Sequence, residues 1–420
     1  MLAYRYLGWT LVAYGLGLLV APIESNFELA PAGLWLWVAS ALMSLLGLYA
    51  ASQWRPAQAP EPAALPAFSL VTASQRLNLL AGFGLLCTVI DRYVLRGAPL
   101  DFDFFAARDA LEATAPTPIG LVGALLGALA CFALGLAVTR HTVGEPLTRR
   151  DALASLAIFT VYVAISIGVG SRSTLLVSVI STLFCVLWVR RAVGQPLQAR
   201  YWLSALAILV GVALVSAALM LERLQLMDLD PFVSIEFSGY AYTVRPSSDA
   251  LDWLTRHAES APLLVAGFSL LQYVFHGLFE FSLFAREPFV ENTHGAVTFW
   301  LPLKLLSVVG VTVGSVDFES ISGWREGIFT TFLGPLYLDF GLLLPLAAFL
   351  LFLALGLPAN RLRADRLALL PYCSVLCALC VLFPIVNLLD SASGAYPLVA
   401  SLLIPWLGRP PRQDHPPRPV

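Results

Sequence analysis

The side chains best suited to chemistry gather in one polar segment, residues 222–330. The segment has six basic and thirteen acidic residues, a net charge of 6 − 13 = −7, and three of the five histidines. Imidazole and carboxylate groups exchange protons near neutral pH, and lysine and arginine bind anionic oxygens. The candidates for these roles are His276, Glu280, Lys304, Glu319 and Arg325. The segment therefore indicates proton transfer beside a bound anion.

A polar stripe marks the stretch 262–284 within this segment. Five polar residues fall at helical spacing on one face of an expected helix: Ser269, Gln272, Tyr273, His276 and Glu280. A glutamate four residues after a histidine can hydrogen-bond the imidazole and raise its basicity, as a general base requires. A helix that faces water above a membrane would show the same stripe. The stripe thus predicts either a general base or a solvated helix face.

Two more groups of charges follow along the chain. A loop expected before residue 330 carries Asp317, Glu319, Arg325 and Glu326. An arginine with carboxylates there can face a ligand that bears both phosphate and hydroxyl groups. Asp339 then lies inside an apolar helix, where a carboxylate needs a partner, most simply an arginine of the outer face. We expect Asp339 to be either a site residue or a structural tether.

The rest of the chain has the composition of a membrane protein. Hydrophobic residues make up 58% and charged residues 12% of the chain, and the mean hydropathy is +0.79, far from the balance of soluble domains. Stretches long enough to cross a bilayer follow one another. They cover 4–21, 33–51, 77–95, 118–138, 152–170, 173–189, 201–221, 330–356, 368–389 and 393–408. We predict an all-α polytopic helical membrane protein that forms one domain over 1–420.

Two further apolar runs, 262–284 and 296–313, leave the number of spans open between about ten and about twelve. The connection between them has one arginine beside Glu287 and Glu291, which makes a poor cytoplasmic loop. Helices striped with polar groups also suit a membrane interface better than lipid. We therefore expect 222–330 to be a long periplasmic segment with interfacial or re-entrant helices.

The distribution of arginine sets the expected orientation. With a cytoplasmic N-terminus, fifteen arginines and only five acids fall in the inner segments, which agrees with the positive-inside rule. These arginines are Arg5, Arg55, Arg76, Arg140, Arg149, Arg150, Arg190, Arg191, Arg200, Arg361, Arg363, Arg366, Arg409, Arg412 and Arg418. The tail 409–420 is then a disordered cytoplasmic tail. The net charge of −2 gives no reason to expect a nucleic-acid partner.

Ten cations on the outer side depart from this rule, and ionisable groups near a membrane core are candidates for function. They are Arg92, Arg96, Arg108, Arg172, Arg223, Arg245, Arg256, Arg286, Arg325 and Lys304. Arg172 lies in the tight turn 170–174 before an expected helix, whose free backbone N–H groups suit phosphate oxygens together with a guanidinium. An arginine that reaches lipid headgroups is the alternative.

The second outer loop combines Arg92, Arg96 and Arg108 with several acids, so we expect salt bridges at a wet surface. The acids are Asp91, Asp101, Asp103, Asp109 and Glu112. The pair Asp101 and Asp103 also has the spacing of two carboxylates that hold a divalent cation against a diphosphate.

The run Thr331–Gly341, read as T-x-x-G-x-x-Y-x-D-F-G, resembles a stretch that opens a late span in bacterial O-antigen and exopolysaccharide repeat-unit polymerases of the Wzy type. Three other pieces are similar to parts of those proteins: the turn Gly170-Ser171-Arg172, the segment Tyr273-x-x-His276-Gly277-x-x-Glu280-Phe281, and the segment His294-Gly295-x-x-Thr298-Phe299. The plan of ten or more spans with a large late outer loop is also similar. The resemblance implies a GT-C-like polymerase or ligase architecture in a bacterial inner membrane.

The resemblance also implies an activity. Such an enzyme joins oligosaccharide repeat units carried on undecaprenyl diphosphate at the periplasmic face, without metal or cofactor, beside a flippase and a chain-length regulator. The resemblance further assigns Arg172, Arg325, Arg108 and Lys304 to the substrate diphosphate. The base is left open among His276, Glu280 and Glu319. Further site candidates on the matching segments are Tyr273, His294, Tyr337 and Asp339.

Three other functions compete with polymerisation. An O-antigen ligase would make a single transfer onto lipid A. A glycosyltransferase that uses a lipid monophosphate sugar would need a metal at Asp101 and Asp103. A transporter or flippase for a polyprenyl-linked glycan would carry charges near the bilayer midplane, whereas here the ionisable groups cluster at span ends.

Overall fold

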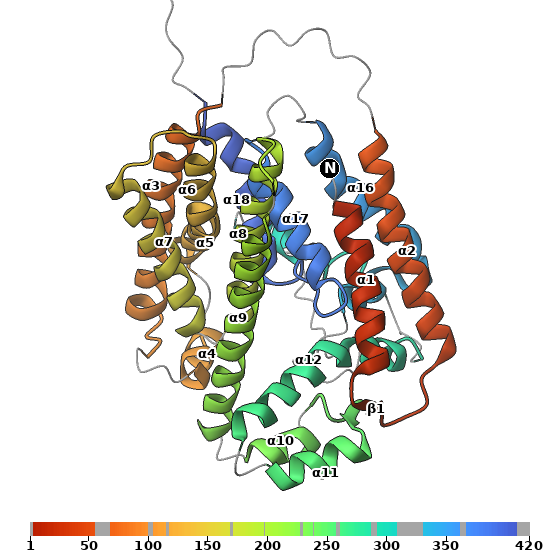
Figure 1. The fold of residues 1–420 in the computed structure, drawn as a ribbon. Coiled ribbons are helices and arrows are strands. Elements are labelled where there is room, and N and C mark those ends of the chain that lie inside the picture. Colours follow the sequence, from red (N-terminus) through yellow and green to blue (C-terminus); the bar gives the residue numbers. More distant parts are fainter. Residues whose placement is uncertain are drawn as a thin grey trace, which may run out of the picture.

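The protein is a bundle of membrane-length helices in a computed structural model (Figure 1). The structure describes residues 3–54, 68–99, 104–114, 117–168, 171–196, 198–226, 230–237, 239–257, 261–286, 292–308, 331–361 and 367–409. Within these ranges, eight helices are long and apolar enough to cross a membrane. The expected all-α polytopic membrane protein is therefore confirmed.

The helices follow the apolar stretches of the sequence. In chain order they are α1 (Ala3–Val20), α2 (Pro31–Gln53), α3 (Leu70–Val89), α4 (Phe104–Glu112), α5 (Pro118–Gly127), α6 (Ala133–Thr142), α7 (Arg149–Gly168), α8 (Arg172–Ala192), α9 (Ala199–Leu226), α10 (Pro231–Phe237), α11 (Ser248–His257), α12 (Pro262–Phe284), α13 (Trp300–Val308), α15 (Leu333–Phe340), α16 (Leu344–Arg361), α17 (Leu370–Leu382) and α18 (Ala392–Leu407). Each of the ten stretches predicted to cross the membrane overlaps at least one of them. Two of these helices, α17 and α18, are apolar but shorter than a full span.

Three irregular turns and one small sheet complete the described structure. A π-helical turn, η1 (Ile90–Leu95), continues α3, and 3₁₀ turns η2 (Ala128–Phe132) and η3 (Gly341–Leu343) join α5 to α6 and α15 to α16. Strands β1 (Ile23–Ser25) and β2 (Val244–Pro246) pair antiparallel, with Glu24 opposite Arg245. The sheet ties the α1–α2 connection to the segment that precedes α11.

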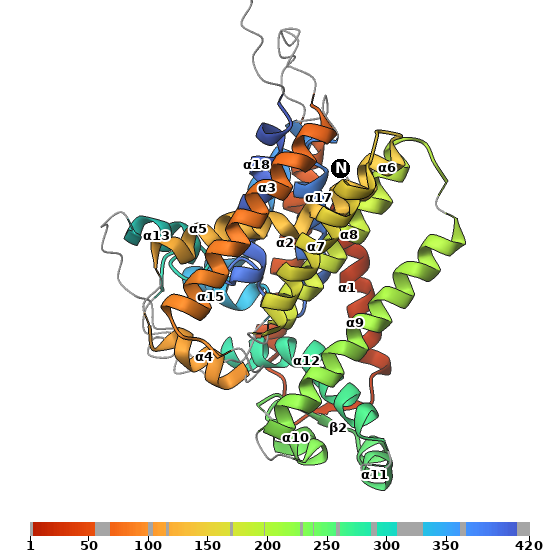
Figure 2. The same ribbon diagram turned by 90° about the vertical axis from the view of Figure 1, so that its left-hand side faces the viewer.

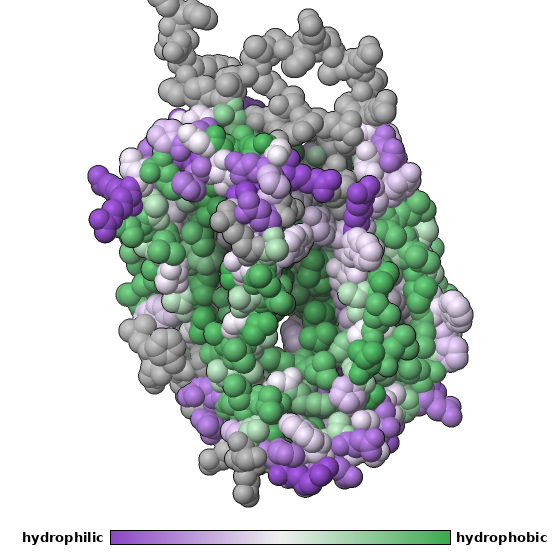
Figure 3. Space-filling model, viewed as in Figure 1, coloured by the Kyte–Doolittle hydropathy of each residue, from purple (hydrophilic) through white to green (hydrophobic). Residues whose placement is uncertain are grey.

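The surface has an apolar belt between two polar ends (Figure 3). The N-terminus and the connections α6–α7 and α8–α9 lie at one end, and α10 and α11 form the other (Figure 1). We call the first the arginine-rich end, because it carries Arg5, Arg140, Arg149, Arg190 and Arg191. Large apolar side chains are exposed on the belt between the ends, as lipid contact requires.

Helix α12 does not run along the bundle. It lies across the end that carries α10 and α11, whereas α1, α2, α8 and α9 extend between the two ends (Figures 1 and 2). It packs against α2, α9 and α10. Its length and composition would allow it to cross a membrane, but this position favours a helix at the membrane face.

Glycines set the distance between the helices that carry the candidate site. A Cβ atom at Gly84 of α3 would overlap the backbone of Gly127 in α5, and one at Gly123 would overlap Thr88. Small residues let the backbones of membrane helices approach closely and gain dispersion contacts. Close contact between α3 and α5 therefore depends on these positions.

The glycine contact gives a stability prediction. Gly84→Ala should destabilise the protein by about 1–3 kcal/mol, because the added methyl group forces α3 away from α5. Gly82→Ala is the matched control, since it adds the same methyl group to α3 where no atom lies within 4 Å. Thermal unfolding in detergent measures both variants. Equal melting temperatures would contradict the proposed contact.

Candidate functional site

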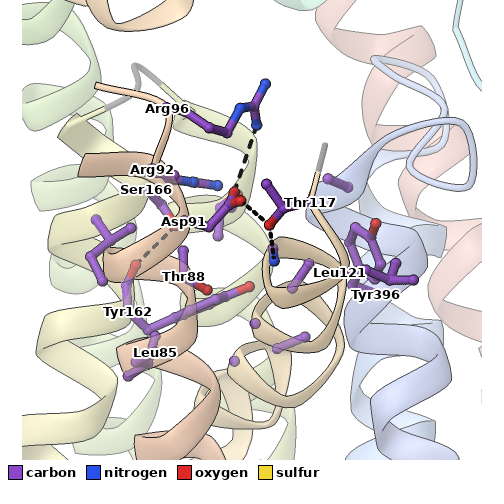
Figure 4. Close-up of a pocket in the computed structure, with 18 of the residues that line it drawn as sticks. Leu85, Thr88, Asp91, Arg92, Arg96, Thr117, Leu121, Tyr162, Ser166 and Tyr396 are labelled. Atoms are coloured by element: carbon purple, nitrogen blue, oxygen red, sulfur yellow. Dashed lines mark hydrogen bonds and ion pairs between the residues drawn. The ribbon is translucent and has the colours of Figure 1, made fainter. Parts of the chain in front are cut away.

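A pocket of about 230 Å³ opens where η1, α5, α7, α8, α13 and α18 meet. Its lining residues Asp91, Arg92 and Arg96 belong to the η1 end of α3, which lies far from the arginine-rich end (Figure 1). Figure 4 shows the side chains of the lining. Three cations and one carboxylate line it: Arg92, Arg96, Lys304 and Asp91. Six hydroxyl groups also line it, from Thr88, Thr117, Tyr162, Ser166, Thr174 and Tyr396. Cations beside hydroxyl donors form a site for an anion that carries several oxygens.

The π-helical turn η1, with Arg96 directly after it, brings three charged residues to the pocket. The Arg96 amide donates to the Asp91 carbonyl over 2.9 Å, a five-residue step that is wider than the four-residue step of an α-helix. This local widening puts Asp91, Arg92 and Arg96 around one opening (Figure 4). Such turns often occur at functional sites.

Asp91 joins two sides of the pocket. Its carboxylate accepts a hydrogen bond from the Thr117 hydroxyl, and Arg96 Nη1 lies 3.7 Å from Oδ2. Thr117 also caps α5, because its oxygen accepts from the Gly120 amide over 3.0 Å. A Cβ atom at Gly120 would overlap the carboxylate, so glycine is required for this contact. The Asp91 residue is only 4% exposed.

The two arginines of the pocket have different surroundings. Arg96 donates from Nε to the Thr114 hydroxyl over 2.9 Å, and from Nη2 to the carbonyls of Thr114 and Leu111, so it is held by the end of α4. Arg92 Nη1 is buried and has no hydrogen-bond partner among the described residues. A buried guanidinium donor without an acceptor is costly, and a bound anion would supply one.

Lys304 reaches the pocket from α13. Its Nζ lies 5.4 Å from the centre of the Trp300 ring, and Trp300 in turn donates to the Leu389 carbonyl over 2.8 Å. Trp300 also packs edge-on against Tyr396 of α18. Burial lowers the pKa of the Lys304 amine, and the positive charge of Arg96 lowers it further. A bound anion would oppose both effects.

Asp339 is a tether for the segment that leads into α13. Its carboxylate accepts hydrogen bonds from the Thr293 hydroxyl and from the amides of Val297, at 3.1 Å, and Thr298, at 2.8 Å. The His294 amide donates to the Asp339 carbonyl over 3.2 Å. Among the described residues these neutral donors, rather than the expected arginine, satisfy the carboxylate oxygens. Asp339 thus positions the helix that carries Lys304.

Two other residues complete this tether. His294 and Gly295 adopt left-handed backbone conformations, with φ of 51° and 96°, which turn the chain back towards Asp339. His294 therefore contributes a turn rather than a pocket side chain.

Burial and the negative charge of Asp339 raise the pKa of Asp390, in the connection before α18, to about 8.

The predicted base candidates on α12 lie elsewhere. His276 and Glu280 are fully buried, and neither lines the pocket. His276 Nδ1 is 2.8 Å from the Tyr273 carbonyl, and its ring is 4.5 Å from that of Tyr240. Glu280 Oε1 accepts from the Thr243 hydroxyl over 2.9 Å. The stripe therefore faces the turn before β2, and of the two alternatives the water-facing helix face does not agree with the burial of Ser269, Gln272, His276 and Glu280.

The remaining candidates fall into three groups. Tyr273 and Tyr337 pack against aromatic neighbours, Tyr240 for the first and Phe281 and Phe284 for the second. Arg172 is the first residue of α8, two positions before Thr174 of the pocket wall, and Arg108 lies on α4, but the side chains of both are outside the described structure. Glu319, Arg325, Asp101 and Asp103 lie outside the described residues.

Sequence reasoning undervalued Arg92 and Arg96, which were expected to form surface salt bridges. One such pair exists, between Arg96 and Asp91, but it lines a pocket. The signal in the sequence was the group of three charged residues, Asp91, Arg92 and Arg96, at the end of an apolar span, where charges are costly.

Comparisons with protein-family models, with characterised proteins and with solved structures give no match for this chain.

The Asp339 tether gives a second stability prediction. Asp339→Ala should destabilise the protein by about 2–5 kcal/mol, because the buried amides of Val297 and Thr298 lose their acceptor. Asp252→Ala, at an exposed position of α11, should change stability by less than about 0.5 kcal/mol. Denaturant unfolding in detergent compares them. A similar loss in both would show that the tether has no special role.

The lowered pKa of Lys304 gives a pH prediction for anion binding. Sulfate should bind the pocket best while Lys304 is protonated, and its affinity should fall as the pH rises towards the ordinary lysine range. Sulfate keeps its charge over this range, so the change reports on the protein. Lys304→Arg should flatten the profile because arginine stays charged. Calorimetric titration at several pH values measures it, and an equally steep fall in the variant would exclude Lys304 as the cause.

Proposed function

We propose that this protein is a membrane glycosyltransferase that joins oligosaccharides carried on a polyprenyl diphosphate. The observation that carries the proposal is the pocket: Arg92, Arg96 and Lys304 converge among hydroxyl groups at one end of a membrane bundle. A diphosphate between a lipid tail and a glycan would lie at this depth, with the tail beside the apolar belt. The motif resemblance supports undecaprenyl diphosphate as the carrier and the periplasmic face of a bacterial inner membrane as the place of reaction.

The chemistry assigned to the pocket is stabilisation of the leaving group. An acceptor hydroxyl attacks the anomeric carbon of the donor sugar, the new C–O bond forms, and the bond from that carbon to the diphosphate oxygen breaks. Negative charge then grows on the diphosphate, and preorganised cations stabilise it. Arg92 has the buried donor for this role, and Arg96 and Lys304 supply further positive charge.

The acceptor hydroxyl gives its proton to a general base, for which the sequence offers His276, Glu280 and Glu319. Glu319 lies outside the described residues, and His276 and Glu280 lie outside the pocket wall. Arg172 remains a candidate for the diphosphate, because α8 begins with it beside the pocket residue Thr174. The N–H groups at the start of that helix would add to the positive potential.

Position favours an enzyme over a transporter. The charged pocket lies at one end of the bundle, whereas a transporter of the common kind binds its substrate near the bilayer midplane. The same proposal implies association with a flippase that delivers the lipid-linked unit and with a chain-length regulator.

The activity test uses the purified full chain with a lipid-linked repeat unit. Polymerisation would give a ladder of products, and a single transfer onto lipid A would instead identify a ligase. No transfer to either acceptor, from protein that remains folded, would overturn the proposal.

Arg92 gives the sharpest activity prediction. Arg92→Ala should slow ladder formation by about a hundredfold or more, because a donor to the leaving diphosphate is lost. Arg92→Lys should recover part of the rate, since it keeps the charge but not the guanidinium fork. Arg256→Ala on α11, at an exposed position, is the control and should keep the wild-type rate. Full activity of Arg92→Ala, with an unchanged melting temperature, would remove the pocket from the active site.

A further inference from the structure

The pocket holds one carboxylate among its cations, which lowers its positive charge. Arg92, Arg96 and Lys304 contribute three positive charges and Asp91 one negative charge, so the described lining sums to 3 − 1 = +2. Asp91 is 4% exposed and is fixed by Thr117 and Arg96, so solvent screens it little and the carboxylate cannot swing away. A pocket built only for the tightest anion binding would not keep this negative charge.

The two diphosphates of the proposed reaction differ in charge. A diphosphate esterified at both ends, such as a lipid-linked sugar, carries one negative charge on each phosphate, or −2. When the sugar leaves, the terminal phosphate becomes a monoester, whose second ionisation near pH 6 adds about one charge at neutral pH. The donor therefore balances a pocket of +2, and the product exceeds it.

We propose that Asp91 is a specificity-determining residue that lowers the preference of the pocket for the diphosphate monoester left after transfer, relative to the diphosphate diester. This inference rests on the proposed function, since it assumes that the pocket binds the diphosphate. Its physical basis is repulsion between the buried carboxylate and the additional charge of the monoester. At a distance of about 8 Å and an effective dielectric constant of about 30, one such charge changes affinity by roughly tenfold.

The geometry around Asp91 supports a role beyond an ion pair. A structural partner for Arg96 alone would not need to face the cavity, and Arg96 is already held by Leu111 and Thr114. The carboxylate instead lies between Arg92 and Thr117 in the pocket wall (Figure 4). Gly120 is required to admit it at the start of α5. Asp91 reduces the hold of the three cations on the more negative leaving group, and this favours product release once the glycosidic bond has formed.

The test compares two ligands with the same tail, farnesyl diphosphate and its P²-methyl ester, at pH 8. Calorimetric titration of the purified full chain in detergent gives both dissociation constants. The ratio of the dissociation constant of the diester to that of the monoester should be about tenfold higher in Asp91→Asn than in wild type, because the variant binds the monoester relatively better. Asp109→Asn, an exposed change on α4, should leave the preference unchanged.

A second variant tests the same idea in the opposite direction. Lys304→Ala lowers the charge of the lining to +1 and should shift the preference towards the diester, again by about tenfold. It keeps the inference testable if Asp91→Asn does not fold, which thermal unfolding would reveal. An unchanged ligand preference in whichever of these variants folds would overturn the inference.

The outcomes also separate this inference from the proposed function. Binding that Arg92→Ala does not weaken would place the ligand outside the pocket, so both proposals would fail. Binding that depends on Arg92, with an equal change for both ligands in Asp91→Asn, would leave the diphosphate site standing and remove only the specificity role of Asp91.

Discussion

The Asp91 carboxylate is the interaction around which the candidate site is built. It connects the π-helical turn at the end of α3 with the first turn of α5 through Thr117, and it contacts Arg96, which is held by the end of α4. This contact is possible only because Gly120 has no side chain, and because Gly84 and Gly127 let α3 and α5 meet closely. Packing of small residues in the apolar part of the bundle thus determines the arrangement of charges at its end.

A second carboxylate, Asp339, works in a different way. It binds no cation among the described residues and instead accepts hydrogen bonds from Thr293, Val297 and Thr298. A buried carboxylate that receives several donors is stabilised without a counter-charge. Its effect is to fix the segment before α13, from which Lys304 enters the pocket. One acid therefore shapes the electrostatics of the pocket, and the other places one of its cations.

The polar groups of α12 form a separate buried cluster. His276 and Glu280 hold the turn that leads to β2, while Gln272 donates to the carbonyls of Ile235 and Val244. These contacts attach the layer of α10, β2 and α11 to the bundle. A polar stripe on an apolar helix can thus serve to dock a covering layer, which is an outcome distinct from both catalysis and hydration.

The sequence by itself determined the class of the protein and the approximate positions of its long apolar helices. Hydropathy is a local property that adds along the chain, so each predicted apolar stretch overlaps a helix. The sequence also identified Lys304 and the start of α8 at Arg172 as candidates, and both lie at or beside the pocket. It offered two roles for Asp339, and the structure supports the tether.

Only the tertiary structure decided which polar groups meet. Asp91 and Thr117 are 26 positions apart, and Lys304 is more than 200 positions from Arg96, yet all four line one pocket. Spacing along one helix placed His276 and Glu280 on a common face, but it could not show that other segments cover that face. The physical reason is that burial and pairing depend on how helices pack against each other, and packing is set by contacts between residues that are distant in sequence.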